Sequence, residues 1–519
     1  KYPFDSGVRL SAAGGWVVSP VHDKADHLSD KTWLRIIQSG KTHKDGFRTI
    51  RQVAENHVVK SDVESFAGDF RKVAKKNPTR FIKLSMAFPS NTNLRYIEAV
   101  ASAAATTKPE QDSELSGMKG EQWAPATCAD CVQFWERFFP LLENTYTVRD
   151  FFWMMQKRSE ADWPNHFYEW LARLAVSHAD PAVDADSYKY RDQTIETASP
   201  SVLASTALNS VRGVAAETIA NILWEKPEKL SVFRDAIEQL VRDPHPAVRQ
   251  SALHLCDFML KYDQDQAVTW FCEACRLDPR VPSARIAIHF FNQTIPKYLP
   301  VIEPIIRSML ASPFDKVAQE GAAEVTARYL FHGCFENEYQ WIRQSGTLAH
   351  KKGVVEAATA LAQQPIYFER CVSILCDYRD EMEQELRNSA HRWITEKVLS
   401  FANAPQCLER YVTDSILKSD NYLLHHLKKH KASILPFRRV IMKFVDHLTA
   451  HLQTATEPTE GWRFHGLSGV LLRLYEESQA ARDSECVGAC LDAWDRLFEA
   501  GFERVRDLSN ELSSYLPQS

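Results

Sequence analysis

Several groups of residues in this sequence have the types and spacing found at chemical sites, and the first resembles a phosphate-binding loop. Ser39-Gly40-Lys41-Thr42 matches the end of such a loop, in which backbone N–H groups and a lysine hold the phosphates. The full motif requires a glycine five residues before Gly40, where this chain has Arg35. It also requires a preceding strand, whereas the pattern here predicts a helix that ends at Gly40. We therefore expect no nucleotide site and no cofactor in this chain.

Two CxxC pairs have the spacing of metal ligands. Cys128 and Cys131 form the first pair, and Cys272 and Cys275 form the second, 141 residues further on. Both lie in apolar helical patterns, so we expect buried structural thiols and no metal site. Cys486 and Cys490, four residues apart, have the same explanation. The total of eleven cysteines is odd and the residues are scattered, which indicates free thiols in a reducing cytoplasm.

His426 and His430 have the spacing of two zinc ligands on one helix. The metalloprotease motif needs a glutamate directly after the first histidine, and Leu427 stands there instead. A solvated basic helix face explains this segment better. Its cations are nevertheless our candidates for contacts with an acidic partner or a nucleic acid. These candidate partner-binding residues are Lys428, Lys429, Lys431, Arg438 and Arg439.

The bulk properties exclude several classes of protein. The chain has 519 residues, too many for one compact core, and no apolar run long enough to cross a bilayer. It starts without Met or a signal sequence, so we expect a cytoplasmic piece of a longer protein. The net charge is −5, yet residues 31–83 hold thirteen Lys/Arg and five Asp/Glu. The basic N-terminal part and the acidic remainder disfavour nonspecific nucleic-acid binding as the main activity.

Helical periodicity and capping signals run through most of the chain. Residues 1–120 are predicted to form helical hairpins after an irregular lead-in, with Asn77-Pro78 and Thr92-Asn93 as helix starts. Residues 121–200 are predicted to be a helical segment followed by a linker that begins near His178. Residues 401–519 keep the helical pattern in an irregular form, and we interpret them as a C-terminal helical cap.

Residues 201–400 contain an internal repeat. Val211-Arg212-Gly213-Val214-Ala215, Val248 to Ala252 and Leu386 to Ala390 are copies of one pattern, with degenerate copies at Ala284, Val317 and Val354. Their first positions are 37, 36, 33, 37 and 32 residues apart, a period typical of stacked helix pairs. We therefore expect buried equivalent positions at Val211, Val248, Val317 and Leu386. The predicted fold is all-α, an α-solenoid of HEAT-like antiparallel helix pairs with irregular helical N- and C-terminal parts.

The segments Ala207 to Ala216 and Asp243 to Ala252 resemble HEAT repeats, and the chain as a whole is similar to the C-terminal part of large bacterial STAND-class ATP-binding proteins. Leu28 to Leu34 and Cys490 to Glu499 fit the same resemblance. Such proteins join an effector, a nucleotide-binding module and a C-terminal helical sensor, and many act in antiviral defence. The resemblance implies that this segment recognises a foreign protein, with chemistry located elsewhere in the full protein.

We accordingly expect a protein-recognition or sensor segment of a multidomain defence ATPase, not an enzyme. Its partner would be a protein, such as a phage protein, bound on the solenoid surface. Nucleophile elbows, paired carboxylates and dinucleotide fingerprints are missing from the sequence, so we expect no catalytic residues. One alternative is a helical-repeat nucleic-acid-binding protein or a HEAT-like DNA glycosylase, which the acidic repeat region disfavours. A constitutive assembly scaffold is the other alternative, and the sequence does not separate it from a sensor.

Overall fold

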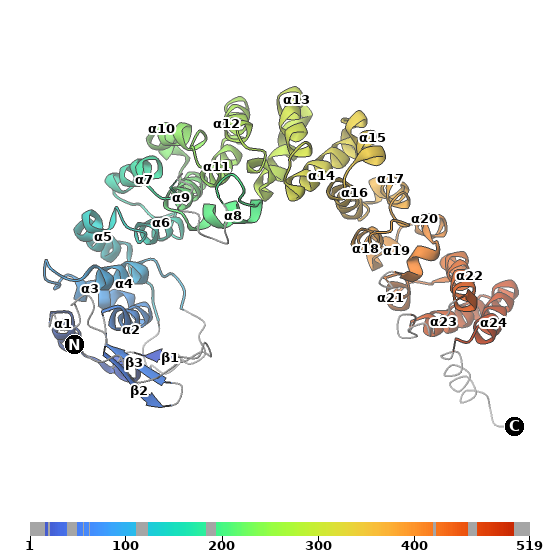
Figure 1. The fold of residues 1–519 in the computed structure, drawn as a ribbon, viewed down its shortest axis with the longest axis horizontal. Coiled ribbons are helices and arrows are strands. Elements are labelled where there is room, and N and C mark those ends of the chain that lie inside the picture. The colour runs from blue at the N-terminus through green and yellow to red at the C-terminus, as the bar shows by residue number, and fades with distance from the viewer. Residues whose placement is uncertain are drawn as a thin grey trace, which may run out of the picture. The chain divides into compact units, whose positions relative to one another are not determined.

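The chain is predominantly helical in the computed structural model, as the sequence predicts (Figure 1). The structure describes residues 16–18, 21–38, 49–54, 57–61, 63–109, 123–182, 194–418, 422–454, 464 and 466–502. The chain divides into two compact units, Lys1–Thr294 and Ile295–Ser519, which are described separately below. Among the helices in these ranges, none is both long and apolar enough to cross a membrane.

A small sheet near the N-terminus was not predicted. β1 (Trp16–Val18) pairs in parallel with β3 (His57–Ser61), and β2 (Thr49–Ala54) pairs with β3 in the antiparallel direction. We expected helical hairpins across this part of the chain, so the all-α prediction needs correction here. The segments of β2 and β3 are short and contain several β-branched residues, a composition that favours strands.

The first unit consists mainly of two layers of helices (Figure 1). In one layer each helix packs against the next. This layer contains α2 (Val63–Lys76), α4 (Leu94–Ala104), α6 (Val148–Gln156), α9 (Val211–Glu225) and α11 (Pro246–Met259). The other contains α3 (Pro78–Ser85), α5 (Cys128–Leu142), α7 (Asn165–Ser177), α10 (Leu230–Leu240) and α12 (Gln264–Arg276). Outside the layers are η1 (His22–His27), α1 (Asp30–Gln38), α8 (Pro200–Asn209), η3 (Pro227–Lys229) and η4 (Val281–Ser283).

Helix starts in the first unit follow local capping chemistry. The Asn77 side chain accepts a hydrogen bond from the Arg80 backbone N–H at 3.3 Å, and Asn93 accepts one from Arg95 at 3.0 Å. These contacts satisfy N–H groups that have no partner inside the helix. The two helix starts predicted at Asn77 and Asn93 are therefore confirmed.

The second unit is likewise built mainly from two layers of helices. α13 (Arg285–Leu310) contains the boundary between the units and has a non-helical residue at Tyr298. One layer contains α14 (Asp315–His332), α16 (Leu348–Leu361), α18 (Gln384–His391), α21 (Tyr422–Lys429) and α23 (Leu467–Ala480). The other contains α15 (Glu336–Ser345), α17 (Pro365–Cys376), α20 (Ala404–Tyr411), α22 (Arg438–Thr454) and α24 (Ser484–Glu499). Between them are α19 (Glu396–Leu399), η5 (Asp414–Lys418) and η6 (Leu435–Phe437).

The predicted repeat positions are buried. Val211, Val248, Val317 and Leu386 all have 0% exposure, and each lies in the first turn of its helix. Residues 194–418, which the structure describes without a gap, contain no strand. Both observations confirm the predicted burial of these four positions and the predicted helical character of this region.

The copy of the repeat predicted at Val354 lies in a different register in the structure. Val354 lies in the middle of α16, whereas the third residue of that helix, equivalent to Val317 in α14, is His350. His350 is buried and bridges two elements, because its Nε2 lies 2.8 Å from the Leu310 carbonyl and its Nδ1 lies 2.8 Å from Thr347 Oγ1. Because this core position holds a polar residue, the hydrophobic pattern did not indicate the correct register of the copy.

Polar contacts join successive helix pairs in the first unit. Arg212, at the start of α9, binds Asp243 in the turn before α11 through Nε and Nη2, at 2.9 and 3.1 Å. Asp180, from the predicted linker, caps α9 through its carboxylate, which accepts the Val211 N–H at 2.6 Å. The Arg249 side chain donates to the Asp243 carbonyl at 2.6 Å and to the Ala274 carbonyl at 3.1 Å. In each Val-Arg copy the valine is therefore a core residue, and the arginine forms hydrogen bonds with the turn between helices.

Candidate functional site

The candidate phosphate-loop residues, Ser39 to Thr42, lie outside the described residues. The segment before them, α1, is a helix that contains Arg35. A phosphate-binding loop of this kind follows a strand, so the structural context required by the motif differs from the one seen here.

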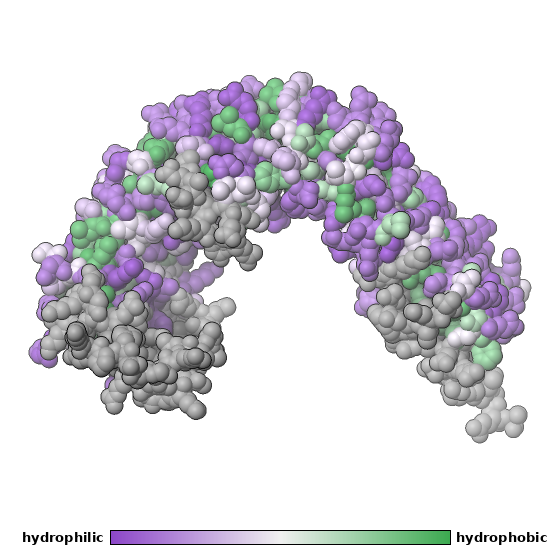
Figure 2. Space-filling model, in the orientation of Figure 1, coloured by the Kyte–Doolittle hydropathy of each residue, from purple (hydrophilic) through white to green (hydrophobic). Residues whose placement is uncertain are grey.

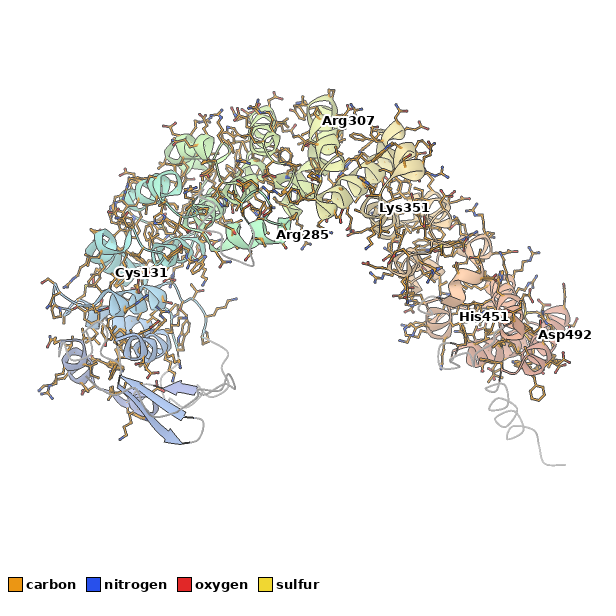
Figure 3. All side chains as sticks on the ribbon, viewed as in Figure 1. Cys131, Arg285, Arg307, Lys351, His451 and Asp492 are labelled. Carbon is orange, nitrogen blue, oxygen red and sulfur yellow. The ribbon has the colours of Figure 1, made fainter. Side chains whose placement is uncertain are left out.

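One cysteine of each CxxC pair is buried, namely Cys131 and Cys275, while Cys128 and Cys272 are partly exposed, so the expectation of buried thiols is correct for one member of each pair. Cys131 is fully buried in α5 (Figure 3), and burial raises the pKa of its thiol to about 12. Burial likewise raises the pKa of Cys272 in α12 to about 11. Zinc binds the thiolate, which such an environment disfavours. Across the described ranges, no group of three or more His, Cys, Asp or Glu side chains could hold a metal ion.

His426 and His430 differ in their surroundings, because His426 is partly exposed and His430 is buried. His426 is on α21, while His430 follows the end of that helix and packs edge-on against Phe437, with ring centroids 6.0 Å apart. Burial lowers the pKa of both imidazoles.

The structure separates the five predicted partner-binding cations into two groups. Arg438 binds Asp483 at 2.6 Å, and Arg439 lies 4.0 Å from Glu409. Lys428, Lys429 and Lys431 are exposed at and just after the end of α21. The two arginines thus have acidic neighbours within this chain. The three exposed lysines are therefore better candidates than the arginines for contacts with a partner.

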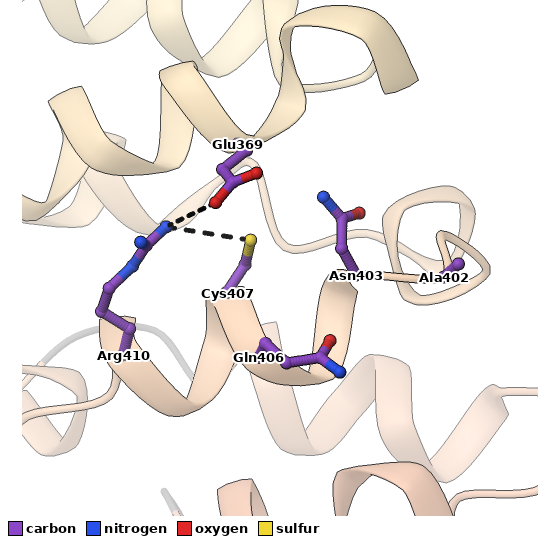
Figure 4. Close-up of a pocket in the computed structure, with 6 residues that line it drawn as sticks. All are labelled: Glu369, Ala402, Asn403, Gln406, Cys407 and Arg410. Atoms are coloured by element: carbon purple, nitrogen blue, oxygen red, sulfur yellow. Dashed lines mark hydrogen bonds and ion pairs between the residues drawn. The ribbon is translucent and has the colours of Figure 1, made fainter.

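Two cavities lie between helices of the second unit. One, of about 400 Å³, lies between α17 and α20 (Figure 4). Its lining residues are Glu369, Ala402, Asn403, Gln406, Cys407 and Arg410. Burial raises the pKa of the Cys407 thiol, so this cysteine lacks the acidic character of a nucleophile despite Arg410 beside it. The other cavity, of about 370 Å³, is bordered by Trp341 and Arg307, and Arg307 is bound to Glu338 at 2.8 Å.

The sequence analysis does not predict an aromatic surface patch that the structure forms from α9 and the residues just after α11. Trp224 and Tyr262 are 45% and 46% exposed, and both rings rest on the buried ring of Phe258, with centroids 5.6 and 4.8 Å away. The Lys261 ammonium lies 5.9 Å from the Trp224 ring centroid and 5.6 Å from that of Tyr262. We call Trp224, Lys261 and Tyr262 the Trp224–Tyr262 patch. Figure 2 shows that hydrophobic surface in general forms separate patches among hydrophilic residues.

The repeat itself carried a signal for this patch. Trp224 and Lys261 are 37 residues apart, the same step that separates Val211 from Val248. Equivalent positions of neighbouring repeats therefore place the tryptophan beside the lysine. Aligning the copies beyond their first five residues would have brought the two side chains together.

Comparison with known proteins adds no family assignment. The sequence matches no protein-family model and no curated protein.

Proposed function

We propose that this chain is a protein-recognition segment whose helix pairs stack in HEAT-like fashion, forming an α-solenoid. Support comes from the two-layer arrangement within each unit and from the buried valines at equivalent positions of α9 and α11. In such a stack each pair contacts only its neighbours, and the outer faces remain available for a partner.

The observation that carries the proposal is the Trp224–Tyr262 patch. Large aromatic side chains that are nearly half exposed are typical anchors of protein interfaces. Phe258 supports both rings from below, so little conformational entropy is lost when a partner covers them. Lys261 between the rings favours an acidic or carbonyl-rich contact on the partner.

We further propose that the segment acts as the cytoplasmic sensor of a STAND-class defence ATPase, bound by a phage protein. This step rests on the resemblance of Ala207 to Ala216 and Asp243 to Ala252 to such proteins. The opposite charge of residues 31–83 and the remainder would help to orient and speed the encounter with a charged partner.

The test is affinity capture from phage-infected and uninfected cells, with the wild-type chain and a Trp224→Ala/Tyr262→Ala variant. We expect one phage protein to be enriched by the wild-type chain and lost with the variant, because interface anchors contribute about 2 kcal/mol or more each. Met382→Ala is the matched control, since Met382 is 94% exposed and distant in sequence from the patch. Capture of the same host protein from both cell samples would favour a constitutive scaffold.

A further inference from the structure

The cavity of about 370 Å³ in the second unit has an exposed tryptophan in its wall. It lies between the end of α13 and the first turns of α15, and its lining residues are Arg307, Leu310, Ala311, Asn337, Glu338 and Trp341. Four of these six residues are exposed and only Leu310 is buried, so the cavity opens to the surface. Small-molecule sites enclose most of their ligand. An open cavity of this kind is better suited to one side chain carried by a larger partner.

The Trp341 ring is held in place by a buried histidine. Trp341 is 44% exposed, and its ring centroid lies 5.1 Å from that of His350, with 77° between the ring planes. His350 is fixed in turn, because its Nε2 donates a hydrogen bond to the Leu310 carbonyl at 2.8 Å and its Nδ1 accepts one from Thr347 Oγ1 at 2.8 Å. The indole therefore loses little conformational freedom when a ligand covers it, which favours binding.

Two carboxylates near Trp341 share a single cation. Arg307 (Figure 3) lies 2.5 Å from Glu303 and 2.8 Å from Glu338, and Glu338 lies three residues before Trp341 on α15. Two negative charges and one positive charge leave a surplus of one negative charge beside the cavity. Arg307 contacts Oε1 of Glu338, so Oε2 can still accept a hydrogen bond from a ligand.

The surrounding sequence has the same sign of charge. Residues 303–341 contain six Asp/Glu and three Lys/Arg. The environment of Trp224 in the first unit is the opposite, since the Lys261 ammonium lies 5.9 Å from its ring centroid. The two tryptophans are almost equally exposed, but the charges beside them select partners of opposite charge.

We infer that the Trp341 cavity, defined by its six lining residues, binds an arginine side chain of a protein partner. The guanidinium stacks on the Trp341 indole and donates to Glu338, while the alkyl stem contacts Leu310 and Ala311. Tryptophan is the ring that attracts a cation most strongly. Arginine suits this site better than lysine, because its planar guanidinium stacks on rings, pairs with carboxylates and is more weakly hydrated than an ammonium.

This inference goes beyond the proposed function, because it assigns a second contact with its own charge preference. It does not depend on the Trp224–Tyr262 patch, which lies on other helices. Either site can therefore fail its test without affecting the other.

The test is fluorescence anisotropy of a labelled Gly/Ser peptide with three arginines, mixed with the full chain at low salt. Matched peptides carry lysine, which keeps the charge, or citrulline, which keeps the shape and removes the charge. We expect the arginine peptide to bind about fivefold more tightly than the lysine peptide, and the citrulline peptide to bind most weakly. Trp341→Ala should weaken binding of the arginine peptide about fivefold and remove its advantage over lysine. Phe498→Ala is the matched control, because it removes a ring that is 52% exposed on α24.

Charge variants give an independent check. Glu338→Gln should weaken binding of the arginine peptide about threefold, whereas Asp492→Asn, which removes an exposed carboxylate from α24, should leave it unchanged. Arg307→Gln should strengthen binding, because it removes the cation that competes with the guanidinium for Glu338. This opposite sign keeps the test decisive if Trp341→Ala folds poorly.

Several results would overturn the inference. These are equal affinities for the arginine and citrulline peptides, equal losses in Trp341→Ala and Phe498→Ala, and weaker binding by Arg307→Gln. Absence of binding at low salt, or tighter binding of a glutamate peptide, would also contradict it. If free L-arginine amide bound as tightly as the peptide, the cavity would be a small-molecule site and the assignment to a protein partner would be wrong.

Discussion

The Arg212 guanidinium and the Asp243 carboxylate form a buried bidentate ion pair, with N–O distances of 2.9 and 3.1 Å. The two side chains are 7% and 6% exposed. Arg212 lies in the first turn of α9 and Asp243 precedes α11, so the pair joins two successive helix pairs. Loss of one partner would leave the other charge buried without compensation, which costs more than the pair itself contributes.

Asp243→Ala is expected to lower the free energy of unfolding of the first unit by roughly 3–5 kcal/mol. Urea denaturation followed by circular dichroism measures the change. Asp446→Ala is the control, because it removes the exposed partner of Arg496, which lies 2.6 Å away. That substitution should cost less than about 1 kcal/mol. Equal destabilisation by the two substitutions would show that the buried Arg212–Asp243 pair contributes no more to stability than an exposed ion pair.

Gly353→Ala is expected to destabilise the second unit by roughly 1–3 kcal/mol, because a new methyl group would overpack the α14–α16 contact. A Cβ at Gly353 would lie 2.0 Å from the Gln319 carbonyl oxygen, so one helix backbone must shift. Gly68→Ala on α2 meets nothing within 4 Å and should instead stabilise its helix by up to about 1 kcal/mol. Melting temperatures of the two variants should move in opposite directions, and a shared direction would contradict the close packing at Gly353.

His391 is expected to make the second unit acid-sensitive. The ring is 1% exposed, neither ring nitrogen has a hydrogen-bond partner among the described residues, and burial lowers its pKa to about 4. The unfolded chain binds the proton more readily, since a free histidine has a pKa of about 6.5. Stability is therefore full above pH 6.5 and falls as the pH drops towards 4, by about 3 kcal/mol in all.

His391→Leu should flatten this decline in melting temperature between pH 6.5 and 4.5. His425→Leu is the control, because His425 is exposed on α21 and should leave the decline unchanged. An undiminished decline in His391→Leu would assign the acid sensitivity to other groups.

The three lysines at and just after the end of α21 are expected to be dispensable for stability. Lys428→Ala, Lys429→Ala and Lys431→Ala together should leave the melting temperature unchanged, because all three side chains are exposed. Arg438→Ala should lower stability by less than about 1 kcal/mol through loss of the Asp483 contact. If the lysines serve a partner, the triple variant should weaken capture of that partner and reduce its salt dependence. A strongly destabilised triple variant would assign these lysines a structural role.

The purified chain is expected to contain no stoichiometric zinc. The thiols of Cys131 and Cys272 have pKa values raised by burial to about 12 and 11, which disfavours the thiolate that zinc requires. Elemental analysis should find substoichiometric zinc, and a chelator should leave the melting temperature unchanged. About one zinc per chain, lost together with stability on chelation, would overturn this expectation.

Features that depend on nearby residues were predictable from the sequence. The helix starts at Asn77 and Asn93 follow from side chains that cap N–H groups two or three positions away. The burial of Val211 and Val248 follows from a hydrophobic face that recurs within each helix and from helix to helix. Periodicity and capping are local properties, so the amino-acid sequence by itself determined the helical class and the core positions of the best repeats.

Features that depend on contacts between distant residues required the tertiary structure. β1 pairs with β3 across some forty residues, and nothing in the sequence of either strand indicates that it pairs with the other. His350 occupies a core position only because the Leu310 carbonyl and Thr347 satisfy its ring nitrogens. The Trp224–Tyr262 patch depends on which helix faces the neighbours leave uncovered. A helical pattern gives the faces of one helix, but only the packing of several helices decides which face stays exposed and which charges meet.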